Sequence, residues 1–162
     1  MSRLDSAIRR LVAQRSCLDM AAGLIRDVPG PVLELGLGNG RTYDHLRTLF
    51  PERGIFVFDR RVAAHPDCIP DDTHMIIGDV MQTLPGALSR IGTRAAMVHS
   101  DIGSGDKAES RRQAGALVRL LGPLLAPGAI VVSDQDMAMA GWPEVALPEG
   151  IAPRRYYVYR LP

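Results

Sequence analysis

The stretch Val32-Leu33-Glu34-Leu35-Gly36-Leu37-Gly38-Asn39-Gly40 decides the fold of this chain. Its first four residues are typical of a buried strand, and glycine then occupies every second position. The residues that follow, Arg41-Thr42-Tyr43-Asp44-His45-Leu46-Arg47, predict a helix. Glycines let the backbone turn tightly and approach a ligand, while the first turn of a helix directs unpaired N–H groups at an anionic group. The stretch therefore predicts a nucleotide-binding turn.

The glycine spacing differs from that of dinucleotide-binding folds. Those folds use G-x-G-x-x-G, and the third glycine of that pattern would fall on Arg41. The pattern here is E-x-G-x-G-x-G, with Glu34 two residues before Gly36. An ordinary strand–turn–helix would use its glycines for packing alone, but three alternating glycines behind a strand-end glutamate favour the binding turn.

Length and composition predict one soluble globular domain, residues 1–162. The chain is 46% hydrophobic and 23% charged, values that are ordinary for a globular protein. With 19 basic and 18 acidic residues the net charge is +1, which gives no strong sign of nucleic-acid binding. Cys17 and Cys68 match neither a zinc spacing nor a disulfide framework. No apolar run is long enough for a membrane span, and we expect a cytoplasmic protein.

Strand and helix patterns alternate along the chain. We expect one helical stretch over 4–27, broken into two helices at Ser16. A loop is expected over 103–106. Further helices are predicted over 41–50, 81–91 and 107–121, and parallel strands over 32–35, 54–59, 75–80, 95–101 and 129–134. The tail, with 145–147 and 154–160 around a Pro-Gly turn, predicts an antiparallel hairpin. Apolar strands alternating with helices indicate a doubly wound α/β fold with a mostly parallel sheet.

Carboxylates recur where the predicted strands end. Ligands of such sheets bind at the carboxyl ends of the strands. The acidic residues expected at this edge are Glu34, Asp59, Asp79, Asp101 and Asp134.

The glycine pattern resembles motif I of the class I S-adenosylmethionine-dependent methyltransferases, of the small stand-alone bacterial type. The resemblance implies their Rossmann-like fold with a C-terminal antiparallel pair, and S-adenosyl-L-methionine as cofactor. In that family the acid, here Glu34, meets the ammonium group of the cofactor, usually through water or a backbone contact. The turn from Gly36 to Gly40 (Gly36, Leu37, Gly38, Asn39, Gly40) makes room for the methionine part and the ribose.

Asp59 is the candidate ligand of the ribose. It ends the second strand 19 positions after Gly40, a spacing that suits acceptance from two ribose hydroxyls. The family uses such a residue for the adenosine ribose. The neighbouring Arg60 also allows an NADP-like interpretation, in which its guanidinium meets a 2′-phosphate, but the missing third glycine argues against that.

Four more positions match the family. Asp79 corresponds to the carboxylate that accepts from the adenine amino group, and the backbone of Val80 would contact the ring. Ser100 and Asp101 end the fourth strand, where the family presents the methyl group, and we expect Asp101 to be catalytic. No aromatic N-P-P-[YF] signature follows, so methylation of amides or nucleobases gains no support.

Asp101, Asp134 and Gln135 resemble the metal-binding set of catechol-type O-methyltransferases. Gln135 departs from the asparagine of that set, and Lys107, the only lysine, is not identified with its catalytic lysine. Oxygen ligands would suit magnesium. Magnesium dependence is thus a hypothesis that activity unchanged in EDTA would remove, and we assign no metal ligand.

His99 shares its face of the fourth strand with Asp101, and we expect a buried hydrogen-bonded histidine rather than a general base. The tail aromatics Trp142, Tyr156, Tyr157 and Tyr159 are expected to pack an edge strand, although a substrate pocket or an oligomer interface would also suit them.

The predicted function is methyl transfer to a small-molecule acceptor. The acceptor pocket is expected to come from the N-terminal helices, the loops after Asp101 and Asp134, and a second subunit of a homo-oligomer. Three alternatives stay open: an adenosyl-nucleotide-binding module without turnover, an aminopropyl transferase-like enzyme that uses the decarboxylated cofactor, and an NAD(P) oxidoreductase.

Overall fold

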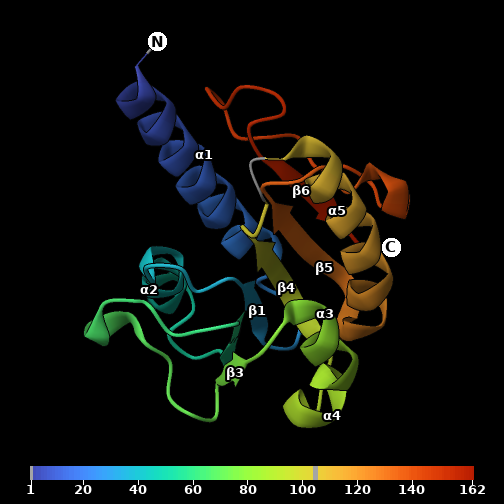
Figure 1. Cartoon of the computed structure of the whole chain (residues 1–162). Helices are drawn as coiled ribbons and strands as arrows, with labels where there is room; N and C mark the ends of the chain where they lie inside the picture. Colours follow the sequence, from blue (N-terminus) through green and yellow to red (C-terminus); the bar gives the residue numbers. More distant parts are fainter. Residues whose placement is uncertain (1, 104–105) are drawn as a thin grey trace.

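A six-stranded sheet forms the centre of the molecule in the computed structural model, which describes residues 2–103 and 106–162 (Figure 1). The strand order is β3-β2-β1-β4-β5-β6; the first five strands are parallel, and β6 is antiparallel to β5. The strands are β1 (Val32–Leu35), β2 (Ile55–Asp59), β3 (Met75–Ile77), β4 (Ala95–Ser100), β5 (Leu125–Ser133) and β6 (Tyr157–Arg160). The predicted α/β class with its antiparallel C-terminal pair is confirmed.

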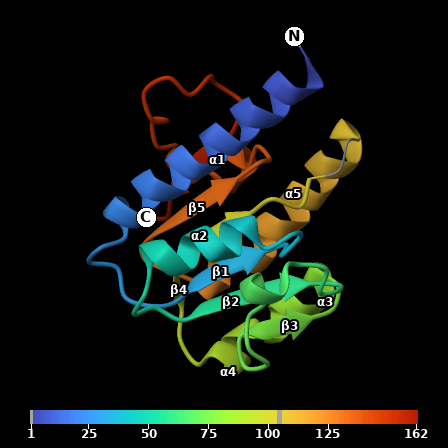
Figure 2. The ribbon, with the colours of Figure 1, turned by 90° about the vertical axis from the view of Figure 1, so that its left-hand side faces the viewer.

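Helices cover both faces of this sheet (Figure 1, Figure 2). On one face, α1 (Arg3–Leu24) and α2 (Arg41–Leu49) bury side chains such as Leu18 and Leu46 against the strands. On the other face lie α3 (Val80–Thr83), α4 (Ala87–Ile91) and α5 (Lys107–Leu121), which buries Leu117. The parallel strands are apolar throughout because both of their faces are buried in this way.

The register of the strands places the functional candidates at one edge. Glu34 on β1 lies opposite His99 on β4, and Asp59 ends β2 beside β3. The carboxyl ends of all five parallel strands meet at this edge, as in other open α/β sheets that bind ligands there. The edge therefore brings together residues that are far apart in the sequence.

The predicted break at Ser16 is wrong, because α1 runs through it without interruption. A serine in a helix interior costs only a few tenths of a kcal/mol, and burial of Cys17 and Leu18 against the sheet outweighs that cost. The helix begins with a capping box, in which Ser2 and Asp5 bond each other's backbone N–H.

Two other predictions need correction. The third strand ends at Ile77, and Asp79 instead caps α3 by accepting a hydrogen bond from the N–H of Met81. The predicted tail hairpin has only one strand, β6, while its first arm makes a single bridge between Glu144 and Tyr159. β5 supplies the antiparallel partner instead.

Short 3-10 turns complete the chain: η1 (Pro66–Cys68), η2 (Leu84–Gly86), η3 (Gly122–Leu124) and η4 (Ala138–Ala140). η2 divides the predicted 81–91 helix, as expected from Pro85 and Gly86. Ser104 and Gly105 of the predicted 103–106 loop lie outside the described residues. No helix within the described part of the chain is long and apolar enough to cross a membrane.

Candidate active site

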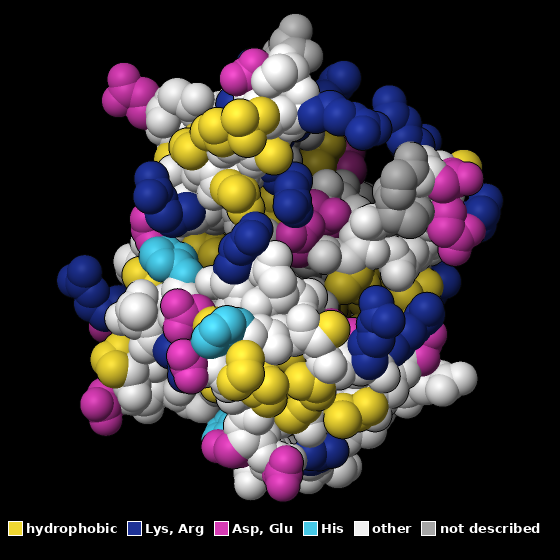
Figure 3. All heavy atoms as spheres, turned by 60° about the vertical axis from the view of Figure 1, so that its left-hand side comes forward, with side chains coloured by type: hydrophobic (Ala, Val, Ile, Leu, Met, Phe, Trp, Pro, Cys, Tyr) yellow, Lys and Arg dark blue, Asp and Glu magenta, His cyan; other side chains and the backbone are white. Residues whose placement is uncertain are grey.

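A cleft of about 590 Å³ opens at the carboxyl edge of the sheet. α1, the glycine turn, the ends of β2 and β4 and the first half of α5 surround it. Figure 3 shows a hollow on this side of the molecule, with basic and acidic side chains at its margin. Its lining includes Arg10, Leu11, Gln14, Gly36, Leu37, Gly38, Asn39, Arg41, Thr42, Phe58, Asp59, Arg60, Gly78, Val80, Asp101, Ile102, Glu109 and Gln113.

The glycine turn has one position that faces open space and one that is tightly packed. Gly38 has φ +52°, and a Cβ added there would meet no protein atom within 4 Å. A Cβ on Gly40, with φ +84°, would lie 2.5 Å from the Cβ of Cys68. Gly40 is therefore required by the fold, whereas Gly38 keeps space free in the cleft.

Asp59 holds this turn in place. Its Oδ2 accepts hydrogen bonds from the backbone N–H groups of Leu37 at 2.8 Å and Gly38 at 3.1 Å, and its Oδ1 accepts from Arg61 N at 3.2 Å. The predicted ribose ligand thus lies against the predicted glycine turn. A carboxylate has about four acceptor sites, so these bonds leave capacity for a bound hydroxyl.

Glu34 begins a buried chain of polar side chains. It is fully buried: Thr42 donates its hydroxyl hydrogen bond to Oε1, and Oε2 lies 2.6 Å from His99 Nδ1. The Nε2 atom of His99 lies 2.8 Å from the hydroxyl of Tyr156. Both carboxylate oxygens of Glu34 therefore have protein partners, an arrangement that suits an indirect or backbone-mediated approach of the cofactor's ammonium group.

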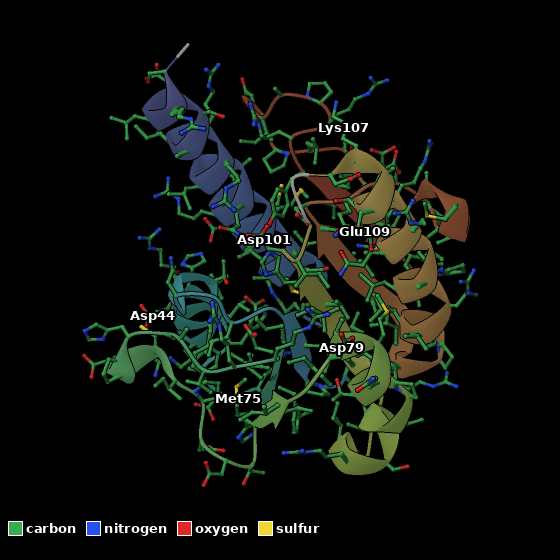
Figure 4. All side chains as sticks on the ribbon, in the orientation of Figure 1. Asp44, Met75, Asp79, Asp101, Lys107 and Glu109 are labelled. Atoms are coloured by element: carbon green, nitrogen blue, oxygen red, sulfur yellow. The ribbon has the colours of Figure 1, made fainter. Side chains whose placement is uncertain are left out.

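The chain continues to the cleft through Gln14 on α1. Its Nε2 donates to Tyr156 Oη at 3.0 Å and to Asp101 Oδ2 at 2.7 Å, and Arg10 also donates to that carboxylate at 3.0 Å. Two side chains of α1 therefore fix the position of the Asp101 carboxylate, which is labelled in Figure 4. Gln14 was not predicted from the sequence, although it lies one helical turn before the buried Cys17 and Leu18, and Tyr156 was expected chiefly to pack an edge strand.

The surroundings of this chain shift the pKa values of two of its groups. Burial lowers the pKa of His99, but the carboxylates of Glu34, Asp101 and Asp134 together outweigh burial and raise the pKa above its ordinary value. Burial strongly raises the pKa of Tyr156, so its hydroxyl stays neutral. Both ring nitrogens of His99 are hydrogen-bonded and its side chain is fully buried, so the prediction of a buried, hydrogen-bonded histidine is confirmed.

Asp79 and Arg60 lie at the other end of the cleft. They form an ion pair, and Asp79 Oδ1 also accepts from Met81 N at 2.9 Å. The Met81 N–H and the Arg60 guanidinium hold the pKa of Asp79 below its ordinary value. Arg60 and Val80 line the cleft. Ser100 lies at the end of β4 fully buried, and its hydroxyl has no hydrogen-bond partner among the described residues.

Asp134 lies behind Asp101. Its Oδ2 accepts from Gly103 N at 3.0 Å, while its Oδ1 is buried without a hydrogen-bond partner in the described part of the chain. Burial and the neighbouring Asp101 carboxylate raise the pKa of Asp134 to about 6. The side chain of Gln135 lies 3.3 Å from Gln113 on α5. Across residues 2–103 and 106–162, no cluster of three or more His, Cys, Asp or Glu is placed to hold a metal ion.

The raised pKa of Asp134 predicts a pH-dependent stability. Between its ordinary value of 3.8 and about 6, the folded state holds a proton that the unfolded state has lost. The contribution of Asp134 is therefore largest below pH 3.8 and is lost as pH rises to 6, by about 3 kcal/mol at most. The Asp134→Asn variant has no carboxyl group at this position and should not lose this stability as pH rises. Urea denaturation of the wild type and the variant at pH 4, 5, 6 and 7 measures their free energies of unfolding. A difference between the two proteins that stays constant with pH would contradict the prediction.

Comparison with known proteins decides the family. Residues 1–161 match the family described as S-adenosyl-L-methionine methyltransferase. The chain belongs to this family. It is therefore an S-adenosylmethionine-dependent methyltransferase, and S-adenosylmethionine is its cofactor. No curated protein matches the sequence.

Solved structures agree with this assignment. The crystal structure of an S-adenosyl-L-methionine methyltransferase from Silicibacter pomeroyi DSS-3 is 44% identical, with TM-score 0.93, and the match covers 100% of this chain and 99% of that one. The sugar N-methyltransferase KedS8 from Streptoalloteichus sp ATCC 53650 is 21% identical (TM-score 0.53; 76% and 48% covered). MycE of the mycinamycin biosynthetic pathway, in complex with Mg and SAH, is 14% identical (TM-score 0.57; 99% and 49% covered). The last two share the fold, and the match spans about half of each.

Proposed function

We propose that this methyltransferase binds S-adenosylmethionine in the 590 Å³ cleft and methylates a small-molecule acceptor beside Asp101. The observation that carries the proposal is the pairing of the Asp59 carboxylate with the open glycine at position 38. A carboxylate bound to the backbone of a glycine turn suits a ribose that lies along this turn.

The residues of the cleft fit this cofactor along its whole length. Asp59 would accept from the ribose hydroxyls, and Arg60, Asp79 and Val80 surround the place proposed for the adenine. Gly36, Leu37, Gly38 and Asn39 leave room for the methionine part. The two cleft-lining arginines at its opposite end, Arg10 and Arg41, suit the methionine carboxylate.

When bound, S-adenosylmethionine supplies a methyl group that its sulfonium charge already activates. The tasks left to the protein are to align the acceptor and to exclude water, and alignment alone can supply roughly 7–11 kcal/mol of the barrier. Asp101 is proposed as the catalytic residue at the methyl position, where Arg10 and Gln14 fix its carboxylate. The side chains of Glu34 and Ser100 are fully buried, so we propose that they influence cofactor binding indirectly, through the residues that line the cleft.

Titration calorimetry with S-adenosylhomocysteine tests the proposal, with NAD and decarboxylated S-adenosylmethionine as parallel ligands. Saturable binding of the first and none of NAD is expected. Preference for the decarboxylated ligand would favour the aminopropyl transferase alternative. Binding without turnover on any acceptor, with and without EDTA, would favour a non-catalytic module.

Gly38→Ala should weaken cofactor binding without unfolding the protein. The new methyl group enters the space that the cleft keeps open, and its left-handed backbone costs about 1 kcal/mol of stability. Gly92→Ala is the matched control, because it also has positive φ (+82°) and open space but lies at the end of α4. We expect similar melting temperatures for the two variants and a loss of S-adenosylhomocysteine affinity for Gly38→Ala alone. Equal affinities would place the ligand away from the glycine turn.

We further propose that the enzyme works in the cytoplasm and forms a homo-oligomer. Cys17 and Cys68 are both unpaired, as expected for a reducing compartment. Four apolar residues of α1 are exposed, a feature that favours contact with a second copy: Leu4, Ile8, Leu11 and Val12. A monomer mass in light scattering would contradict the oligomer.

A further inference from the structure

A second cavity, of about 820 Å³, lies behind the wall of the cofactor cleft. It is bounded by α5, the segment that follows β5, and the start of β6. The wall between the two spaces contains Asp134, which bonds Gly103 N, and the contact between Gln113 and Gln135. Gln113 lines the first cleft, while Asp134 and Gln135 line the second. The two cavities are therefore adjacent.

Three cations surround this second cavity: Lys107 and Arg111 on α5, and Arg154 before β6. Among the described residues, none of these three side chains forms an ion pair or a hydrogen bond, whereas Arg112 on the same helix is paired with Glu109. The acidic residues that line the cavity are Asp134 and Asp136. Lys107, labelled at the upper right of Figure 4, begins α5. Lys107 and Arg111 lie four residues apart on the helix, and an anion bound between them would offset the repulsion of their like charges.

Arg154 has an unusual backbone. Its φ of +63° makes it the one non-glycine residue with positive φ in the described ranges. Such conformations are retained chiefly at functional sites, where the surrounding structure enforces them. This backbone places a third positive charge at the cavity, opposite the two on α5.

Asp134 supplies a base between the two cavities. One of its oxygens is buried without a hydrogen bond among the described residues, and burial together with the carboxylate of Asp101 raises its pKa to about 6. A carboxyl group with such a pKa is ionised near neutral pH and still accepts a proton readily. The charged groups that act on it are Asp101 and His99, together with the N–H dipole of Gly103.

We propose that the second cavity holds one end of the methyl acceptor, a carboxylate or phosphate group bound by Lys107, Arg111 and Arg154, while the hydroxyl or amine at its other end extends past Asp134 to the methyl position beside Asp101. Tyr157 and Met139 provide apolar surface for its carbon skeleton. The inference rests on the proposed function. The hydroxyl or amine of the acceptor forms the new bond to the methyl carbon, the S–CH₃ bond breaks with its electron pair left on sulfur, and the released proton passes to Asp134.

Ligand binding tests the charge preference directly. Protein saturated with S-adenosylhomocysteine is titrated with benzoate, benzyl alcohol, benzylamine and inorganic phosphate. Benzoate should bind at least about tenfold more tightly than the neutral and cationic analogues, since hydrogen bonds to charged groups are the stronger ones. Tighter binding of phosphate than of benzoate would assign a phosphate acceptor. Equal binding of benzoate and benzyl alcohol would overturn the proposal.

Variants locate the binding. Lys107→Met with Arg111→Met should weaken benzoate binding by about tenfold or more and leave S-adenosylhomocysteine affinity unchanged, while Arg119→Met, on the same helix but outside the cavity, should change neither. Arg154→Gly should weaken benzoate binding and raise the melting temperature, because it removes the charge together with the strained backbone. Benzoate affinity unchanged in all these variants would overturn the proposal. Failure of S-adenosylhomocysteine to bind the wild type would instead contradict the proposed function.

Discussion

Glu34→Ala is expected to lower the free energy of unfolding by about 3–5 kcal/mol, the usual cost of removing one partner from a buried ion pair. The substitution leaves Nδ1 of the fully buried His99 and the hydroxyl of the partly buried Thr42 without their acceptor. The Glu34 carboxylate is also the largest of the contributions that raise the pKa of His99 against burial, so its removal favours a neutral imidazole. Urea denaturation at pH 7 measures the loss of stability.

Two further variants separate charge from packing. Glu34→Gln retains a hydrogen-bonding side chain of the same size and should cost less than the alanine variant. Asp44→Ala removes an exposed ion pair with Arg47 on α2 and should cost less than about 1 kcal/mol. If Glu34→Ala were no more destabilising than Asp44→Ala, the buried chain would not contribute to stability.

The glycine turn and the parallel strands could be predicted because their signals are local. Val32–Leu35 and Ala95–Ser100 are short apolar runs, and the glycines that follow the first run require positive φ, as found at Gly38. Strand alternation also placed His99 on the same face as Asp101, and the structure brings both into one hydrogen-bonded chain. Local patterns therefore determined which strand ends carry the site.

The partners of those residues could not be predicted in this way. Gln14 and Tyr156 are separated by 142 positions and meet only because α1 and the start of β6 pack on the same part of the sheet. The break expected at Ser16 failed for a related reason: the weak local preference of a serine is overruled by tertiary burial of its neighbours. The second cavity likewise depends on the approach of α5 to residues that follow β5.

Asp59→Ala is the prediction with the largest expected effect on ligand binding. A hydrogen bond donated by a ribose hydroxyl to a charged acceptor contributes about 1.5–3 kcal/mol, so S-adenosylhomocysteine affinity should fall by about tenfold or more. The variant also removes the acceptor for Leu37 N and Gly38 N, which loosens the turn against which the ligand lies. Calorimetric titration, with circular dichroism to show that the fold is retained, measures the effect.

The neighbouring Arg61→Ala provides the control for this experiment. Arg61 donates its backbone N–H to Asp59, yet its side chain does not line the cleft, so the substitution should leave affinity unchanged. Because Asp59 ends β2 and is only partly buried, its replacement should leave the sheet intact, and weakened binding by a folded protein can be attributed to the lost carboxylate. Wild-type affinity in Asp59→Ala would show that the ribose lies elsewhere, and the orientation proposed for the cofactor would then be wrong.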